Sequence, residues 1–145
     1  MSSEGAKTFT LEIVKPNGHV LTAEVEECVI PGELGSFGVL AGHTPFIAQV
    51  GVGEIMYRTG NTKSFLAVDG GFCEVRPSKV TVLAESAERS QEIDLERASR
   101  AKDRAAEQLG RTLQGEGLEK IDLARRKLRR AEVRLGVARK RPSVA

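Results

Sequence analysis

The sequence contains few of the residues that mark several large classes of protein. Among its 145 residues there is no tryptophan, there are only two cysteines and two histidines, and aromatic residues make up 4%. Two widely separated cysteines, each in an apolar run, do not provide a disulfide framework or a zinc site, so we expect two buried free thiols. No apolar run is long enough to span a bilayer, and the N-terminus lacks the features of a secretory signal. We therefore expect neither an integral membrane protein nor a secreted one.

The charge and the glycines are unevenly distributed along the chain. The net charge of +2 combines −4 in residues 1–86 with +6 in residues 87–145, and 11 of the 15 glycines lie in the first of these segments. Such a shift indicates two parts with different architecture. We place a first domain at residues 1–87 and a second at residues 88–145.

The first part is predicted to be a β-structure. Apolar and polar residues alternate between Thr8 and Val14, as in a strand with one buried face. Turn-forming residues separate the later runs, with Pro16-Asn17-Gly18 after the first strand and Pro77-Ser78 joining the last two. The predicted strands are 8–14, 20–30, 53–59, 63–69, 72–76 and 79–85. This pattern favours an antiparallel β-sandwich or a flattened barrel.

A glycine-rich stretch at residues 31–45 interrupts the strand pattern. It lacks the Gly-Lys-Ser/Thr ending and the following helix of a nucleotide-binding P-loop. Two interpretations stay open, a structural loop at one end of the sandwich and a binding loop.

The second part is predicted to be an antiparallel pair of helices. Ser90 is a suitable N-cap, Gly110 can end the first helix, and only a short connection precedes the second helix. An apolar stripe at helical spacing marks the second helix: Ile121, Ala124, Leu128, Ala131, Leu135 and Ala138. Because alanines bury little area, we expect the helices to be weakly held and able to move.

Arginines on the predicted helices form a candidate anion site. Arg126, Arg130 and Arg134 lie four residues apart on one helix face, where they repel one another unless anions meet them. With Arg97 and Arg104 of the first helix they could bind a polyphosphate, since guanidinium groups suit phosphate oxygens. The alternative is a solvated charged face, in which Asp94 and Arg97 form a surface ion pair.

Other functions find less support in the sequence. A nucleic-acid-binding or ribosome-binding module would use the basic helices, but these carry no aromatic residue for stacking on bases. A small hydrolase would use His43 or a thiol, yet no nucleophile and base are paired by spacing, and His19 lies in a turn. We expect no catalytic residue and no metal ligand.

Four segments together resemble the epsilon subunit of bacterial F-type ATP synthase. The family patterns G-[acid]-F-G-[aliphatic]-L-P-G-H-x-P, G-G-F-x-E-V-x-P, V-T-[aliphatic]-L-A and [Ile/Leu]-D-x-x-R-A are similar to residues 35–45 (GSFGVLAGHTP), 70–77 (GGFCEVRP), 80–84 (VTVLA) and 93–98 (IDLERA). They occur in the same order at compatible distances, and the resemblance extends from Phe9 to Ala138.

The resemblance implies a fold, a set of partners and a mode of regulation. The fold is a ten-stranded β-sandwich followed by a helical hairpin, in a non-catalytic central-stalk subunit that binds the gamma subunit and the c-ring of a proton-translocating ATP synthase. The complex lies on the cytoplasmic side of the bacterial plasma membrane, so contact with the membrane is only through the complex. In the family the helices lie folded down, or extend toward the alpha and beta subunits and inhibit ATP hydrolysis.

The resemblance also assigns residues to these roles. No cofactor is required, but ATP holds the compact form in some members, at positions that correspond to Glu88, Ile93, Asp94, Arg97, Ala98, Arg104, Arg130 and Arg134. The c-ring contact maps to Ser36 and His43, although the family acid is replaced by Ser36 and the family proline by Ala41. We expect Arg126, Arg130 and Arg134 to meet the beta subunit when the helices are extended.

Overall fold

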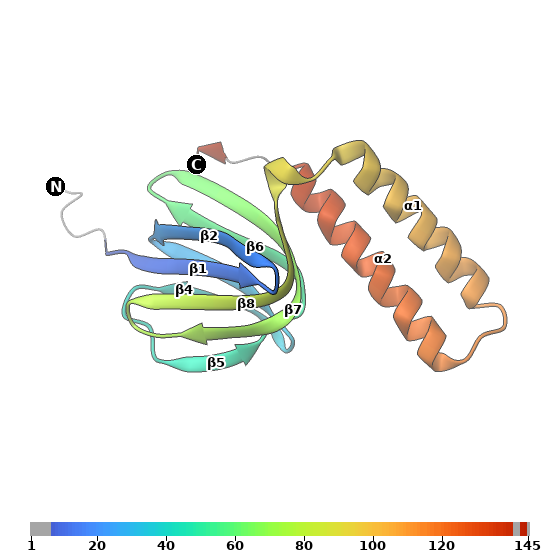
Figure 1. Ribbon diagram of the computed structural model, residues 1–145, viewed down its shortest axis with the longest axis horizontal. Helices are drawn as coiled ribbons and strands as arrows, with labels where there is room; N and C mark the ends of the chain where they lie inside the picture. Colours follow the sequence, from blue (N-terminus) through green and yellow to red (C-terminus); the bar gives the residue numbers. More distant parts are fainter. Residues whose placement is uncertain (1–6, 141–142, 145) are drawn as a thin grey trace.

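The computed structural model describes residues 7–140 and 143–144 as a β-sandwich followed by two helices (Figure 1). The strands are β1 Phe9–Lys15, β2 Gly18–Val25, β3 Glu27–Gly32, β4 Gly35–Leu40, β5 Phe46–Gln49, β6 Val52–Thr59, β7 Thr62–Val75, β8 Lys79–Arg89 and β9 Ser143–Val144. The helical segments are the 3-10 turn η1 Ser90–Glu92 and the helices α1 Leu95–Thr112 and α2 Leu118–Ala138.

The predicted β-plus-α architecture is confirmed, with two differences in the sheet. The strands follow the order β2-β1-β8-β7-β6-β3-β4, and both β5 and β9 pair with β7. The described residues form nine strands instead of about ten. The sandwich is also not wholly antiparallel, because β1 runs parallel to β8. No tight turn joins these two strands, so their direction is not constrained by a hairpin.

The glycine-rich stretch and two of the predicted strands differ in detail. Most of residues 31–45 form the hairpin of β3 and β4 instead of a loop, and the predicted strand 20–30 is divided between β2 and β3. The predicted strands 63–69 and 72–76 are one strand, β7. That strand bends at Gly70 and Gly71, which have φ values of +73° and +111°.

The bend in β7 joins the two layers of the sandwich. A side chain at Gly71 would put its Cβ 1.9 Å from the carbonyl oxygen of Leu83, so only glycine fits beside β8. Inside the sandwich the largest fully buried side chains include Phe9, Leu11 and Ile13. The described residues of this core all lie between positions 9 and 87, so the helices are not part of it.

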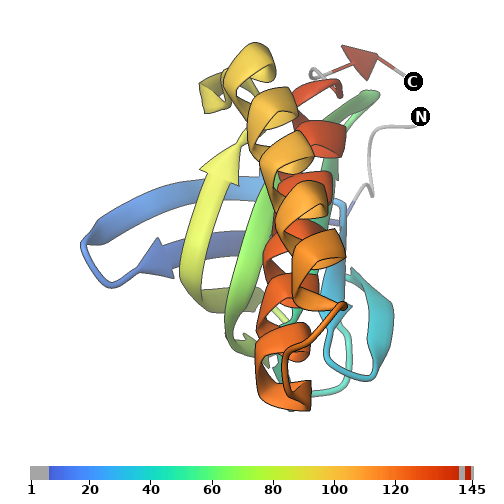
Figure 2. The same cartoon turned by 90° about the vertical axis from the view of Figure 1, so that its right-hand side faces the viewer.

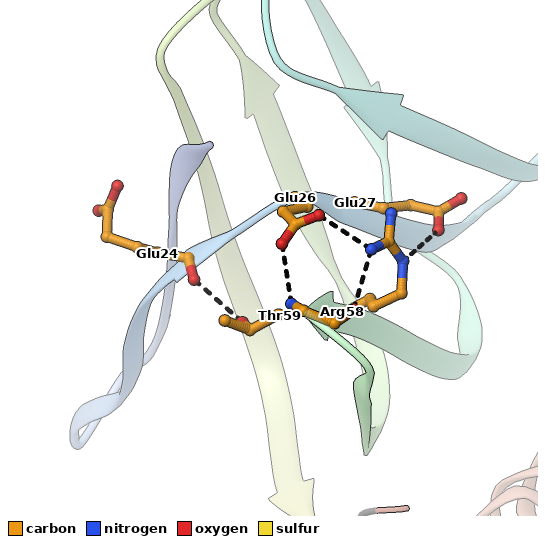
Figure 3. Close-up of polar contacts among 6 residues, drawn as sticks. Glu24, Glu26, Glu27, Arg58 and Thr59 are labelled. Atoms are coloured by element: carbon orange, nitrogen blue, oxygen red, sulfur yellow. Dashed lines mark hydrogen bonds and ion pairs between the residues drawn. The ribbon is translucent and has the colours of Figure 1, made fainter. Parts of the chain in front are cut away.

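A polar cluster fixes the β6–β7 turn to the corner between β2 and β3 (Figure 3). The Arg58 guanidinium contacts Glu26 and Glu27 at 3.0 and 3.3 Å, and the amide of Gly60 donates to Glu26. The amide and then the guanidinium lower the pKa of Glu26. Each of these two carboxylates is paired within the cluster, which therefore acts as a structural contact.

The two helices form the predicted antiparallel hairpin, and α2 packs against β6 and β7 while α1 lies outside it (Figures 1 and 2). Along the predicted stripe, Ala124, Ala131, Leu135 and Ala138 are buried. No helix in the described part of the chain has the length and apolar character needed to cross a membrane.

The predicted ends of the first helix are wrong. Ser90 begins the turn η1, and the N-cap of α1 is Asp94, four residues later. Gly110 lies within α1, which continues to Thr112 and ends without a left-handed residue at Leu113. Two good capping residues close together made the sequence ambiguous at the start of this helix.

We predict that Gly71→Ala lowers the free energy of unfolding by about 2–4 kcal/mol, because it combines an unfavourable φ with a collision with β8. Urea unfolding followed by circular dichroism measures this change. The matched control is Gly136→Ala in α2, where nothing lies within 4 Å of the added Cβ. The free energy of unfolding of Gly136→Ala should rise by up to about 1 kcal/mol, because alanine is the better helix former. Equal effects of the two substitutions would contradict the role of the bend.

Candidate functional site

Two adjoining hollows between α1 and α2 form an arginine-lined groove. One has a volume of about 250 Å³ and the other about 210 Å³, and they share Ala101, Arg104 and Arg134. The cationic side chains along the groove are those of Arg97, Arg100, Arg104, Lys127, Arg130 and Arg134. The structure thus brings together the four arginines that the resemblance assigns to an ATP site. Arg100 and Lys127 join them, and the sequence analysis missed both.

Helical spacing explains how the groove collects these charges. Arg97, Arg100 and Arg104 lie three and four residues apart on α1, and Arg130 and Arg134 lie four apart on α2, so each set occupies one helix face. The small side chains of Ala101, Ala105 and Ala131 line the same space. Arg100 could have been found in the sequence from its i+3 spacing to Arg97.

The three-arginine row of α2 meets carboxylates of the sandwich. Arg126 Nη2 lies 2.9 Å from Asp69 Oδ1, and Arg130 contacts the other oxygen of the same carboxylate. Arg134 binds both oxygens of Glu88, with Nε at 2.6 Å and Nη2 at 3.2 Å. Acids of the same chain therefore supply the anions that neutralise the row, while the side chains of Arg126 and Arg130 stay half-exposed.

The arginines of the groove differ in their partners. Within residues 7–140 the structure records no ion pair for Arg97, Arg100, Arg104 or Lys127. Three of these cations line the groove from α1 and Lys127 lines it from α2, and none of them is paired with a carboxylate in the described part of the chain. Such an arrangement favours binding of an anion with several charged oxygens.

The other predicted ATP-site residues have structural contacts in this conformation. Ile93 and Ala98 are buried in a small apolar cluster between the hairpin and the sandwich. Asp94 accepts a hydrogen bond from the backbone amide of Arg97 at 3.0 Å, which is an N-cap contact. The recorded contact of Asp94 is with this amide, not with the Arg97 guanidinium that one alternative paired it with.

The predicted c-ring residues lie on the β3–β4 hairpin and the segment after it. The His43 ring packs against Phe46 at a centroid distance of 5.5 Å, and Phe46 packs against Phe37 at 5.2 Å. Ser36 is exposed, and because it precedes Phe37 on β4 its side chain points to the opposite face. The structure therefore does not join Ser36 to the aromatic group around His43. Leu34, at the tip of this hairpin, is fully exposed.

An apolar surface that the sequence analysis missed covers the outer side of β5, β7 and β8. Ile47, Phe72 and Leu83 are 72%, 57% and 56% exposed. They line one shallow pocket, and Phe72 and Leu83 also line a neighbouring cleft of about 590 Å³. The sequence placed Phe72 and Leu83 in predicted strands, but alternation alone does not show which strand face is left uncovered.

The two thiols and His43, which a hydrolase would use, each have a local structural environment that the structure describes. Burial raises the pKa of both Cys28 and Cys73 to about 12, so these thiols are protonated and unreactive at neutral pH. Both are free, as predicted. His43 Nδ1 lies 3.1 Å from the backbone oxygen of Thr44. No group of three or more potential metal ligands occurs among the described residues.

A family model and three relatives of similar sequence all point to ATP synthase epsilon chains. A family model described as "ATP synthase, Delta/Epsilon chain, beta-sandwich domain" matches residues 8–90. The chain is 44% identical over 133 residues to an ATP synthase epsilon chain of Nitratidesulfovibrio vulgaris, covering 90% of this chain and 96% of the relative. It is 42% identical to one of Desulfitobacterium hafniense (92% and 98%) and 41% identical to one of Bacillus pumilus (92% and 99%).

Solved structures show the same fold at low sequence identity. A chain of the Euglena gracilis mitochondrial ATP synthase (OSCP/F1/c-ring) superposes with a TM-score of 0.75 at 23% identity, covering 92% of this chain and 82% of that one. A chain of the Tetrahymena thermophila mitochondrial ATP synthase (central stalk and c-ring) gives 0.63 at 9% identity, covering 91% and 97%.

We predict that Asp94→Ala destabilises the start of α1 by about 1 kcal/mol, because the amide of Arg97 loses its cap. Asp94→Asn should leave the helix unchanged, since asparagine caps as well as aspartate does. Hydrogen exchange of the amides in the first turn of α1 measures both effects. Equal protection in Asp94→Ala and the unmodified chain would contradict the capping role.

Proposed function

Because the chain belongs to the family of ATP synthase epsilon chains, we propose that it is a non-catalytic central-stalk subunit that links gamma to the c-ring. It would act in a complex at the cytoplasmic side of the bacterial plasma membrane. The observation that carries this proposal is the match of both parts of the chain, sandwich and helices, to these relatives over nine-tenths of its length.

The apolar surface of β5, β7 and β8 supports a protein partner at this side of the sandwich. Ile47, Phe72 and Leu83 form an exposed patch beside the 590 Å³ cleft, and Lys15 and Glu85 are among the charged residues that line the cleft. An apolar centre with charged residues around it is the usual composition of a protein interface. We assign this surface to gamma.

We assign the β3–β4 hairpin and the segment after it to the c-ring. Leu34, Ser36 and Gly35 form an exposed tip, and His43 lies on the half-buried aromatic group that follows. Glu33 is exposed in the same turn, so the contact there would combine apolar area with a carboxylate and a hydroxyl group.

We assign regulation of ATP hydrolysis to the helical hairpin. In the docked conformation its contact with the sandwich is a small apolar cluster in which alanines are prominent, together with ion pairs. Such a contact buries limited area and can be exchanged for another. In the extended conformation, the Arg126, Arg130 and Arg134 row would meet acidic segments of the beta subunit.

The arginine-lined groove supports ATP as a regulatory ligand of the docked hairpin. Its unpaired cations, Arg97, Arg100, Arg104 and Lys127, suit a triphosphate. A ligand that joins α1 to α2 would stabilise the folded-down form, because the groove exists only when the helices are antiparallel neighbours. A nucleic-acid partner is less well supported, since two arginines of the α2 row are held by Asp69.

We predict that a chain ending at Ser90 still co-purifies with gamma, and that ATP hydrolysis by the reconstituted complex increases. The sandwich core lies within residues 9–87, so the shortened chain retains it.

In the full chain, Phe72→Asp should weaken binding to gamma about tenfold or more. Unchanged hydrolysis after truncation would overturn the regulatory role, and undiminished binding by Phe72→Asp would overturn the docking surface.

We predict saturable binding of ATP to the isolated full chain in isothermal titration calorimetry. Arg97→Ala and Arg104→Ala should each weaken it about tenfold, the value of one charge-assisted hydrogen bond. Arg76→Ala is the control, since Arg76 lies in the turn between β7 and β8, outside the groove, and pairs with Glu74. Absence of heat at millimolar ATP would show that the groove is not a nucleotide site.

A further inference from the structure

The contact between α2 and the sandwich contains several ion pairs beside its small apolar cluster. Four cations of the C-terminal part meet three carboxylates of the sandwich: Arg126, Arg130, Arg134 and Lys140 with Asp69, Glu88 and Glu54. We call these seven residues the ion-pair cluster. Its acids come from three neighbouring strands, β6, β7 and β8.

Strand register explains why the three acids lie on one face. Ala67 on β7 pairs with Glu54 on β6 and with Glu88 on β8, so these three side chains point the same way. Asp69 is two residues after Ala67 and shares its face. Ala67 is buried against the hairpin. Carboxylates therefore surround the small residue on which α2 packs.

Asp69 holds a special place in the ion-pair cluster. It is only 5% exposed, and each of its two oxygens receives an arginine one helical turn from the other. Glu88 and Glu54 each meet one cation. Glu88 accepts two hydrogen bonds from Arg134, and Glu54 lies 2.8 Å from the ammonium group of Lys140. Among the described acids of the cluster, Asp69 is thus the one that joins two turns of α2.

We infer that Asp69 holds the hairpin against the sandwich by pairing with Arg126 and Arg130, and so sets how readily the hairpin leaves it. Undocking separates the acids from the cations, and the guanidinium groups must exchange a nearly buried partner for water. The apolar cluster around Ala67 and Leu135 is small, and two ion pairs on adjacent turns of α2 add a directional constraint on the orientation of that helix. This role requires neither ATP nor gamma.

The test is hydrogen exchange of the isolated full chain, with the α1 and α2 amides reporting docking. Asp69→Asn keeps the shape of the side chain and removes the charge, and should speed exchange in α1 and α2 about tenfold while β-sandwich amides remain protected. Raising the salt concentration should weaken docking in the unmodified chain more than in this variant. The control is Glu74→Gln, which removes an equal charge from β7 beyond the bend, where Glu74 pairs with Arg76 outside the ion-pair cluster.

A variant on the helix side separates docking from a local effect on β7. Arg126→Gln combined with Arg130→Gln should reproduce the faster exchange, and adding Asp69→Asn to it should cause little further change, because all three remove the same interaction. If Asp69→Asn also alters the sandwich, the exchange rates of the helix variant show whether the ion pairs hold the hairpin, because that variant leaves β7 unchanged. Unchanged exchange in the helix variant, or an equal effect of Glu74→Gln, would overturn the inference.

Discussion

The contact between the basic face of α2 and the acidic outer face of β6, β7 and β8 determines the arrangement of the two parts. The sandwich segment is net negative and the C-terminal segment net positive, and ion pairs between opposite charges join them where they meet. Small residues at the centre of the contact, such as Ala67 and Ala138, allow a close approach. Ion pairs then fix the orientation that the small apolar cluster leaves open.

The bend in β7 makes this contact available. Gly70 and Gly71 turn the strand, so that residues 62–69 pair with β6 while residues 72–75 pair with β5. The strand half before the bend carries Ala67 and Asp69 toward α2. The half after it carries Phe72 onto the exposed apolar surface. One strand therefore contributes both to the contact with the hairpin and to the surface assigned to gamma, on either side of two glycines.

The sequence predicted the architecture and the arginine groups but not their partners. Alternation, turns and helical spacing are local properties, so the sandwich, the hairpin and the row from Arg126 to Arg134 could be predicted from them. The role of Asp69 could not be predicted in this way, because its arginine partners lie 57 or more positions further along the chain. The uncovered face at Phe72 and Leu83 was missed for a similar reason, since alternation does not show whether a face meets the helices, a partner or water.

Arg134 shows how the groove and the ion-pair cluster can use one side chain together. A guanidinium has five N–H donors, and Arg134 directs Nε and Nη2 to Glu88 while lining the groove between the helices. Donors remain for an anion on the groove side, so a phosphate bound there need not break the contact with Glu88. Such an anion would join α1 to α2 while Glu88 joins α2 to β8. Binding in the groove and docking on the sandwich would then reinforce each other, because both require the same position of this helix.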